Sequence, residues 1–219
     1  VDRGSGGGRC PAVHGWRQAR GLGMLFRGAT LDDVLFKVLR ALSSSRRAHT
    51  VVASRGVTRE LTGVLVRIEE PRARISVASV RSQLFSCLAE LFWYLSGSNK
   101  LKQIRFYVRP YEMESDDGIT IPSAYGPRLF RMDGVNQVEN VIALLKRNSS
   151  SRRAVIQIFD APDLTAEKSP PCTCFLQFMV RGHRLHAFVS MRSNDAYLGL
   201  PHDVFAFTML QEMLAREIG

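Results

Sequence analysis

Metal-binding clusters are missing from this 219-residue sequence, and cysteine is scarce. The four cysteines form no C-x-x-C pair, and the five histidines are scattered along the chain. This spacing argues against a zinc site, and we predict no metal. In a reducing compartment the cysteines are free thiols, so one of them is available as a nucleophile.

Long hydrophobic runs are also missing. No apolar stretch is long enough to cross a bilayer, and the start of the chain lacks the apolar core of a signal peptide. We therefore expect a cytoplasmic protein with no membrane partner.

Acidic residues are the minority, with 20 Asp and Glu against 30 Lys and Arg, which gives a net charge of +10. Such a surplus suits nucleic acid, an acidic membrane surface or small phosphorylated substrates. The charge alone does not choose among these partners.

The organisation of the chain indicates one folded domain behind a polar arm. Residues 1–23 are rich in Gly and Arg and show no periodicity, so we interpret them as a disordered arm, a cloning remnant or translation upstream of a start at Met24. The whole chain is 45% hydrophobic, so residues 24–219 can bury one full-sized core.

Hydrophobic periodicity predicts both helices and strands. A capping box from Thr30 to Asp33 opens the first helix. Helical spacing is found at residues 31–42, 83–95, 135–147 and 204–219. Strand-like runs lie at residues 51–52, 61–68, 154–159, 175–180 and 184–190. The segment 100–134 is predicted to be irregular.

The most informative stretch is Ser169–Asp203, which reads SPPCTCFLQFMVRGHRLHAFVSMRSNDAYLGLPHD. Cys172 follows two prolines, and an Arg-Ser-x-Asp block with an LG-x-P turn comes after two strand-like runs. The pattern resembles the core of the thymidylate synthase family, where PPC holds the nucleophile and RS-x-D-x-x-LG-x-P lines the nucleotide pocket. The resemblance covers about residues 26–219.

This resemblance implies an α+β fold, with a mixed β-sheet and flanking helices, that packs through its sheet into a homodimer. It implies that Cys172 adds to C6 of a pyrimidine and makes C5 nucleophilic. Arg192 would favour the thiolate and contact the phosphate, with Ser193 as a further phosphate donor, while Asp195 and Gly199 would support the pocket. The commonest fate of a free cysteine such as Cys172 is that of a buried structural thiol, and Asp195 could equally be a structural acid paired inside the fold.

Three further segments match the family. Glu90 opens the run ELFWYLSGS, similar to E-L-L-W-F-L-x-G-x-T, where the Glu orders water and relays protons. Tyr125 lies in AYGPR, similar to V-Y-G-x-x-W-R, and is implied to support the pocket. Arg55 and the pair Arg152 and Arg153 match arginines that grip the phosphate, the pair acting from the neighbouring subunit. Without the resemblance, such a Glu is more often ion-paired and such arginines are more often solvent-facing charge.

The substrate base depends on one departure from the family, because Pro201-His202-Asp203 stands where thymidylate synthases have P-F-N. An Asn amide matches N3–H and O4 of uracil. An ionised Asp only accepts, so it can accept from the cytosine amino group, and it can also bond N3 if the pair shares a proton. Asp at this position resembles the deoxycytidylate hydroxymethylases of the family. The structural alternative is that Asp203 caps the following helix.

The favoured function is therefore transfer of one carbon from 5,10-methylenetetrahydrofolate to C5 of CMP or dCMP, followed by water addition. Two tryptophans of the family are absent, with Pro110 and Met113 at the nearest positions, and their loss favours water. The enzymatic alternative is methylation of dUMP to dTMP. The other alternative is an inactive relative that binds nucleic acid, which we do not expect because no aromatic-basic RNA motif occurs.

Overall fold

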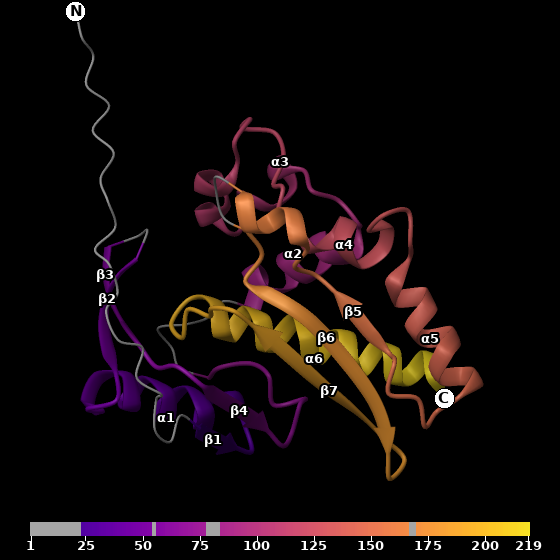
Figure 1. Cartoon of the computed structure of the whole chain (residues 1–219), viewed down its shortest axis with the longest axis horizontal. Helices are drawn as coiled ribbons and strands as arrows, with labels where there is room; N and C mark the ends of the chain where they lie inside the picture. Colours follow the sequence, from indigo (N-terminus) through magenta and orange to yellow (C-terminus); the bar gives the residue numbers. More distant parts are fainter. Residues whose placement is uncertain (1–22, 54–55, 78–83, 167–169) are drawn as a thin grey trace, which may run out of the picture.

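The computed structural model describes residues 23–53, 56–77, 84–166 and 170–219, and Figure 1 shows their arrangement. Arg55 and nearly all of the predicted arm at residues 1–23 lie outside these ranges. The described chain combines helices with parallel and antiparallel strands, which confirms the α+β class. No helix in these ranges has the length and apolar character that a membrane span requires.

An antiparallel three-stranded sheet lies at the centre of the C-terminal half. Its strands, in spatial order, are β5 (Val155–Gln157), β6 (Thr173–Arg181) and β7 (Arg184–Met191). The sheet has two faces: Leu176 and Phe178 on β6 are fully buried, whereas Phe175 is 40% exposed. Gly182 and His183, both at positive φ, form the two-residue turn between β6 and β7.

The buried face of the sheet packs against the long helix α6 (Gly199–Ile218), which runs behind β6 and β7 in Figure 1. Phe205, Leu210 and Leu214 of this helix are nearly inaccessible and share one core with the sheet. Two further helices complete this core, α2 (Leu84–Leu95) and α5 (Gln137–Arg147). The burial of these apolar stripes is the main source of stability for the body of the protein.

The N-terminal part forms a smaller unit of strands around one helix. Its elements are β1 (Met24–Gly28), α1 (Leu31–Ser44), β2 (His49–Ala53), β3 (Gly56–Glu60) and β4 (Val64–Ile68). The predicted capping box is confirmed, because Asp33 N donates to Thr30 Oγ1 at 3.1 Å and Thr30 N donates to Asp33 Oδ2 at 2.9 Å. β4 pairs in parallel with β1, and β2 pairs with β3 as a hairpin. The predicted strand over 61–68 is thus confined to 64–68.

Two arginines hold this unit in place. Arg59 donates to the carbonyls of Ser43 and Ser45 at 2.8 and 3.1 Å, and so satisfies groups that the end of α1 leaves unpaired. The buried Arg74 donates to Glu212 of α6 at 2.5 Å. A buried guanidinium requires a charged partner, so this contact ties the N-terminal unit to the long helix.

The segment 100–134, predicted to be irregular, contains three short helices: α3 (Leu101–Ile104), η2 (Arg109–Glu114) and α4 (Tyr125–Arg131). A Cβ atom on Gly126 would lie 3.0 Å from Cα of Gly97, so only glycine allows α4 to approach the turn after α2 this closely. This approach brings the Tyr125 ring to 5.0 Å from the Tyr94 ring, measured between centroids. One more short helix, η3 (Ala161–Thr165), follows β5.

Phe178→Ala tests the sheet–helix core. The side chain is fully buried, so we expect a loss of about 3–5 kcal/mol in the free energy of unfolding. Phe36→Ala is the matched control, because Phe36 is 66% exposed on α1 and its truncation should change stability by less than about 1 kcal/mol. Urea denaturation measures both, and equal losses would contradict the assigned core.

Candidate functional site

Cys172 lies immediately before β6, in a loop that Arg192 holds from the end of β7. The Arg192 main-chain N–H donates to the Cys172 carbonyl at 2.9 Å. Its side chain donates from Nε to the Pro171 carbonyl at 2.9 Å and from Nη2 to the Pro170 carbonyl at 2.7 Å. Nη2 also lies 4.0 Å from the Cys172 Sγ. The predicted nucleophile and the predicted phosphate arginine are therefore brought together, with a cation beside the thiol.

Tyr125 supports the next residue of this loop. Its hydroxyl accepts from the Thr173 main-chain N–H at 3.2 Å and donates to Thr173 Oγ1 at 3.0 Å. Burial raises the pKa of Tyr125 far above its usual range, so the phenol stays neutral. The strand register then passes from Thr173 opposite Met191 to Phe175 opposite Ser190, a bulge that ends regular pairing next to Cys172.

Asp203 lies inside α6, one turn after its first residue. The helix begins at Gly199 with Leu198 as its N-cap, so the alternative that Asp203 caps this helix is wrong. Its carboxyl instead accepts from Asn194 Nδ2 at 2.7 Å. Burial, reinforced by the negative charge of Glu90, raises the pKa of Asp203 to about 8, although the bond from Asn194 opposes this shift. Asp203 therefore keeps its proton at neutral pH.

Glu90 is buried on α2 and has two side-chain partners. The Tyr111 hydroxyl donates to Oε1 at 2.5 Å, and His202 Nδ1 lies 2.7 Å from Oε2. This confirms that a Glu in such an apolar helix is paired. Burial by itself would lower the pKa of His202. The contacts with Cys87 and Glu90 outweigh burial and raise this pKa to about 10.

The loop from 193 to 199 is organised by Asp195. Its Oδ1 accepts from the main-chain N–H groups of Tyr197 and Leu198 at 2.7 and 2.9 Å, so the carboxylate shapes the entry to α6. Gly199 lies beside Asp203, because a Cβ atom built on it would be 3.7 Å from Asp203 Oδ2. Ser193 is exposed between Arg192 and Asn194.

Arg152 and Arg153 are not close to Cys172 in the same chain. Both are exposed just before β5. The Arg152 carbonyl accepts from Gln177 Nε2 at 2.8 Å. Gln177 is five residues along β6 from Cys172, or about 17 Å at about 3.3 Å per residue. Arg55 lies outside the described residues, so of the four predicted phosphate arginines the structure places one, Arg192, at the thiol.

The sequence analysis assigned no role to three residues that the structure places in the site: Tyr111, Asn194 and His202. Tyr111 lies in a segment that shows no periodicity, so no local signal points to it. Asn194 falls between two matched residues, at a position where the family pattern allows any residue. His202 did have a signal, because a polar ring replaces the phenylalanine of P-F-N. In the described part of the chain, no group of three or more His, Cys, Asp or Glu side chains is arranged to hold a metal ion.

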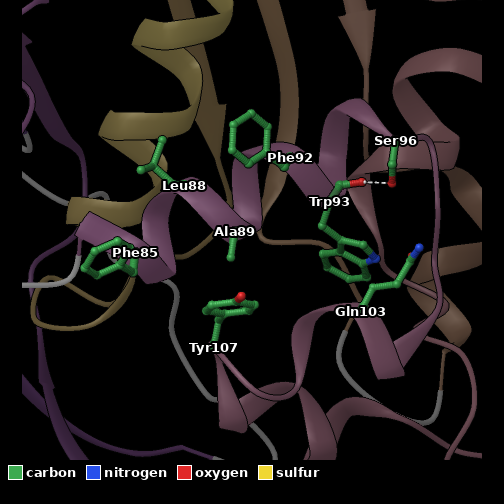
Figure 2. A pocket seen from close by; sticks show the side chains of 8 residues that line it. All are labelled: Phe85, Leu88, Ala89, Phe92, Trp93, Ser96, Gln103 and Tyr107. Carbon is green, nitrogen blue, oxygen red and sulfur yellow. Dashed lines mark hydrogen bonds between the residues drawn. The ribbon is translucent and has the colours of Figure 1, made fainter.

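A separate pocket of about 380 Å³ lies between α2 and the segment that carries Gln103 and Tyr107, as Figure 2 shows. Aromatic and aliphatic side chains dominate its wall. The lining residues are Phe85, Leu88, Ala89, Phe92, Trp93, Ser96, Gln103 and Tyr107. No carboxylate, thiol or imidazole lines it, so this pocket is distinct from the site around Cys172.

The chain is similar in sequence to known proteins. The family model of thymidylate synthase matches residues 43–219. A deoxyuridylate hydroxymethyltransferase of Delftia phage PhiW-14 is 33% identical over 174 residues, which cover 73% of this chain and 48% of the relative. A thymidylate synthase of Francisella tularensis subsp. holarctica (strain FTNF002-00 / FTA) is 30% identical over 177 residues, which cover 73% of this chain and 64% of the relative. The chain thus spans about half to two thirds of the length of these curated relatives.

Solved structures agree with the sequence relatives. Thymidylate synthase from T4 phage superposes with a TM-score of 0.53 at 29% identity, over 59% of this chain and 51% of that chain. Thermostable thymidylate synthase A from Bacillus subtilis superposes with a TM-score of 0.53 at 32% identity, over 60% and 50%. Because the family match extends over most of the chain and the solved relatives share its fold, this protein belongs to the thymidylate synthase family.

Proposed function

We propose that this protein transfers a one-carbon unit from 5,10-methylenetetrahydrofolate to C5 of a cytidine monophosphate, CMP or dCMP, and that water addition yields 5-hydroxymethylcytidylate. Family membership supports the reaction class and the folate co-substrate. The observation that carries the choice of base is the carboxyl of Asp203, which Asn194 holds. Asp203 and Cys172 both act electrostatically on Tyr125, which supports one shared site.

Cys172 acts as the nucleophile in this proposal. Its thiolate adds at C6, a sulfur–carbon bond forms, and the electrons of the C5–C6 double bond make C5 nucleophilic. The Arg192 guanidinium, 4.0 Å from the sulfur, stabilises the negative thiolate. Its remaining N–H donors and the Ser193 hydroxyl would contact the phosphate.

Asp203 recognises the base. With its pKa raised to about 8, it carries a proton at neutral pH. Because Asn194 donates to Oδ2, that oxygen is the acceptor and Oδ1 carries the proton. One fixed donor and one fixed acceptor suit N3 and the amino group of cytosine. A base with the reverse order would leave buried polar groups unpaired, which lowers kcat/KM by about 10⁴-fold or more in sites built on such bonds.

The composition of the short helix η2 supports a hydroxymethyl product rather than a methyl product. This segment has Pro110 and Met113 where the resemblance expects tryptophan, and Met113 is 66% exposed. In the same segment, Tyr111 contacts Glu90, the residue that we assign to ordering water. A site with ordered water and no covering tryptophan favours water over hydride as the final reactant.

Uridylate is the second candidate substrate. One relative is named a deoxyuridylate hydroxymethyltransferase and another a thymidylate synthase. A protonated Asp203 offers the same two kinds of hydrogen bond as an asparagine amide, so dUMP would bind if the base presented N3–H to Oδ2 and O4 to Oδ1.

We also propose a homodimer that shares its active sites. The sheet face that points away from α6 exposes Phe175, Phe188 and Val155 by 40–48%. A second copy would cover these apolar side chains. Arg152 lies before β5, where its carbonyl accepts from Gln177 Nε2, five residues along β6 from its own Cys172, so it would serve the site of the partner copy.

The reaction is tested by incubating the protein with methylenetetrahydrofolate and, in turn, CMP, dCMP and dUMP. We expect tritium release from C5 of a cytidylate, no dihydrofolate absorbance, and a product heavier by one formaldehyde unit. Cys172→Ala should reduce turnover by at least about 10³-fold, because the covalent step is lost. Cys174→Ala is the matched control and should retain most activity. Turnover of dUMP with dihydrofolate would establish a thymidylate synthase instead, and nucleic-acid binding without any turnover would contradict an enzyme.

Asp203→Asn tests the base. We expect the ratio of kcat/KM for the cytidylate to kcat/KM for dUMP to fall by at least about 100-fold, because the amide can present either hydrogen-bond order, whereas the donor and acceptor oxygens of Asp203 are fixed. The wild-type rate with cytidylate should fall as the pH rises through about 8, since Asp203 then loses the proton that N3 requires. The variant should lack this decline. Unchanged specificity in Asp203→Asn would contradict the role of Asp203.

Complementation tests the shared site. Cys172→Ala and the double variant Arg152→Ala with Arg153→Ala should each be inactive or strongly impaired alone. Mixed after unfolding and refolding together, they should recover roughly a quarter of wild-type turnover, because half of randomly paired dimers contain one intact site. No recovery, with dimers present in sedimentation analysis, would show that the arginines do not act across the interface.

A further inference from the structure

His202 lies between the two acids of the site. It directly precedes Asp203 in α6, and its Nδ1 is 2.7 Å from Glu90 Oε2 on α2. Its other nitrogen, Nε2, is 3.3 Å from Ser86 Oγ. The exposed fractions of the His202 and Glu90 side chains are 13% and 8%. A protonated imidazole donates from both nitrogens, so this geometry suits the imidazolium.

The groups around His202 contain more acid than base. On α2 it faces Glu90 and Cys87, and Tyr111 of η2 contacts the same Glu90. On its own helix the neighbouring acid is Asp203. The negative charge of Glu90 disfavours ionisation of Asp203, whereas the positive charge of His202 favours it. A single imidazolium therefore acts on both carboxyls.

We propose that His202 is a positioning residue for both acids: its contact orients the Glu90 carboxyl, and its positive charge, next to Asp203 in the chain, limits how firmly Asp203 keeps the proton that recognises the base. This inference rests on the proposed function and deepens it. Two carboxyls with different protonation states can serve as ionised relay and as neutral hydrogen-bond donor within one site. His202 contacts the first acid and modulates the second, without contact to the substrate.

Two adjacent departures from the family pattern, at residues 202 and 203, create this arrangement. Where thymidylate synthases have P-F-N, this chain adds an acid at Asp203 and a base at His202. A phenylalanine at residue 202 could not donate to Glu90. Of the hydrogen bonds from Tyr111 and His202 to the buried Glu90 carboxyl, only that from Tyr111 would remain. His202 thus pairs with Glu90 at the place where Asp203 brings a second acid into the site. The pKa of His202, raised to about 10, agrees with this geometry.

The first test needs no substrate. The titrations of the Asp203 carboxyl carbon and of the His202 ring are followed by NMR in the whole chain. We expect His202→Asn, which retains an N–H donor for Glu90 but no charge, to raise the titration midpoint of Asp203 by about one pH unit. His49→Asn, on the exposed strand β2, is the matched control and should leave that midpoint unchanged. An unchanged Asp203 midpoint in His202→Asn would overturn the proposal.

Glu90→Gln gives a second measurement that does not depend on the folding of a His202 variant. It removes the carboxylate opposite His202, so the titration midpoint of His202 should fall by about 2 pH units towards its ordinary value. A wild-type His202 that already titrates near its ordinary value would overturn the proposal.

The last test connects His202 to base recognition. Calorimetry gives the Kd of CMP and of dCMP between pH 7 and 10, for the wild type and for His202→Asn. We expect wild-type binding to weaken above about pH 8 and the same weakening to begin at higher pH in the variant. A weaker Kd in the variant with the same pH profile would indicate a merely structural role. If the wild type binds no cytidylate, the proposed function fails, while the NMR midpoints still decide the role of His202.

Discussion

The pairing of β6 with β7 is the constraint on which the rest of the site depends. A two-residue turn at Gly182 and His183 joins the strands, and the ladder runs back to Arg192, whose N–H donates to the Cys172 carbonyl at 2.9 Å. The guanidinium of the same residue then bonds the two proline carbonyls that precede the thiol. Since a slip of one residue would turn every side chain to the other face, the buried Leu176 and Phe178 keep this register.

The first turns of α6 supply the acid–base groups of the site. The helix begins at Gly199, which places Gly199 and Asp203 one turn apart on the same face, beside the loop that carries Asn194. The adjacent His202 projects in a different direction and reaches Glu90 on α2. The low exposure of His202 and Glu90 strengthens their contact, so a cation lies beside Glu90, while burial keeps a proton on Asp203.

Agreement between sequence and structure is best where the signal is local. The capping box at Thr30 and the helical stripes of α1, α2 and α5 were predictable, because each depends on side chains three or four residues apart. The start of α6 was placed too late, since the LG-x-P turn is itself the first turn of the helix. The short helices between residues 100 and 134 have no periodicity of their own and depend on contacts such as that between Gly126 and Gly97.

The sequence by itself determined the family, the α+β class and the residues around Cys172, because PPC, RS-x-D and LG-x-P are contiguous runs whose letters and spacing are specific. Only the tertiary structure decided which groups meet: Tyr111 and His202 at Glu90, and Asn194 at Asp203. Tyr111 and His202 are 21 and 112 residues from Glu90, and Asn194 reaches Asp203 only because the loop folds back on the helix. The protonation of an acid depends on its burial and on charges brought near it by folding, and neither can be read from adjacent letters.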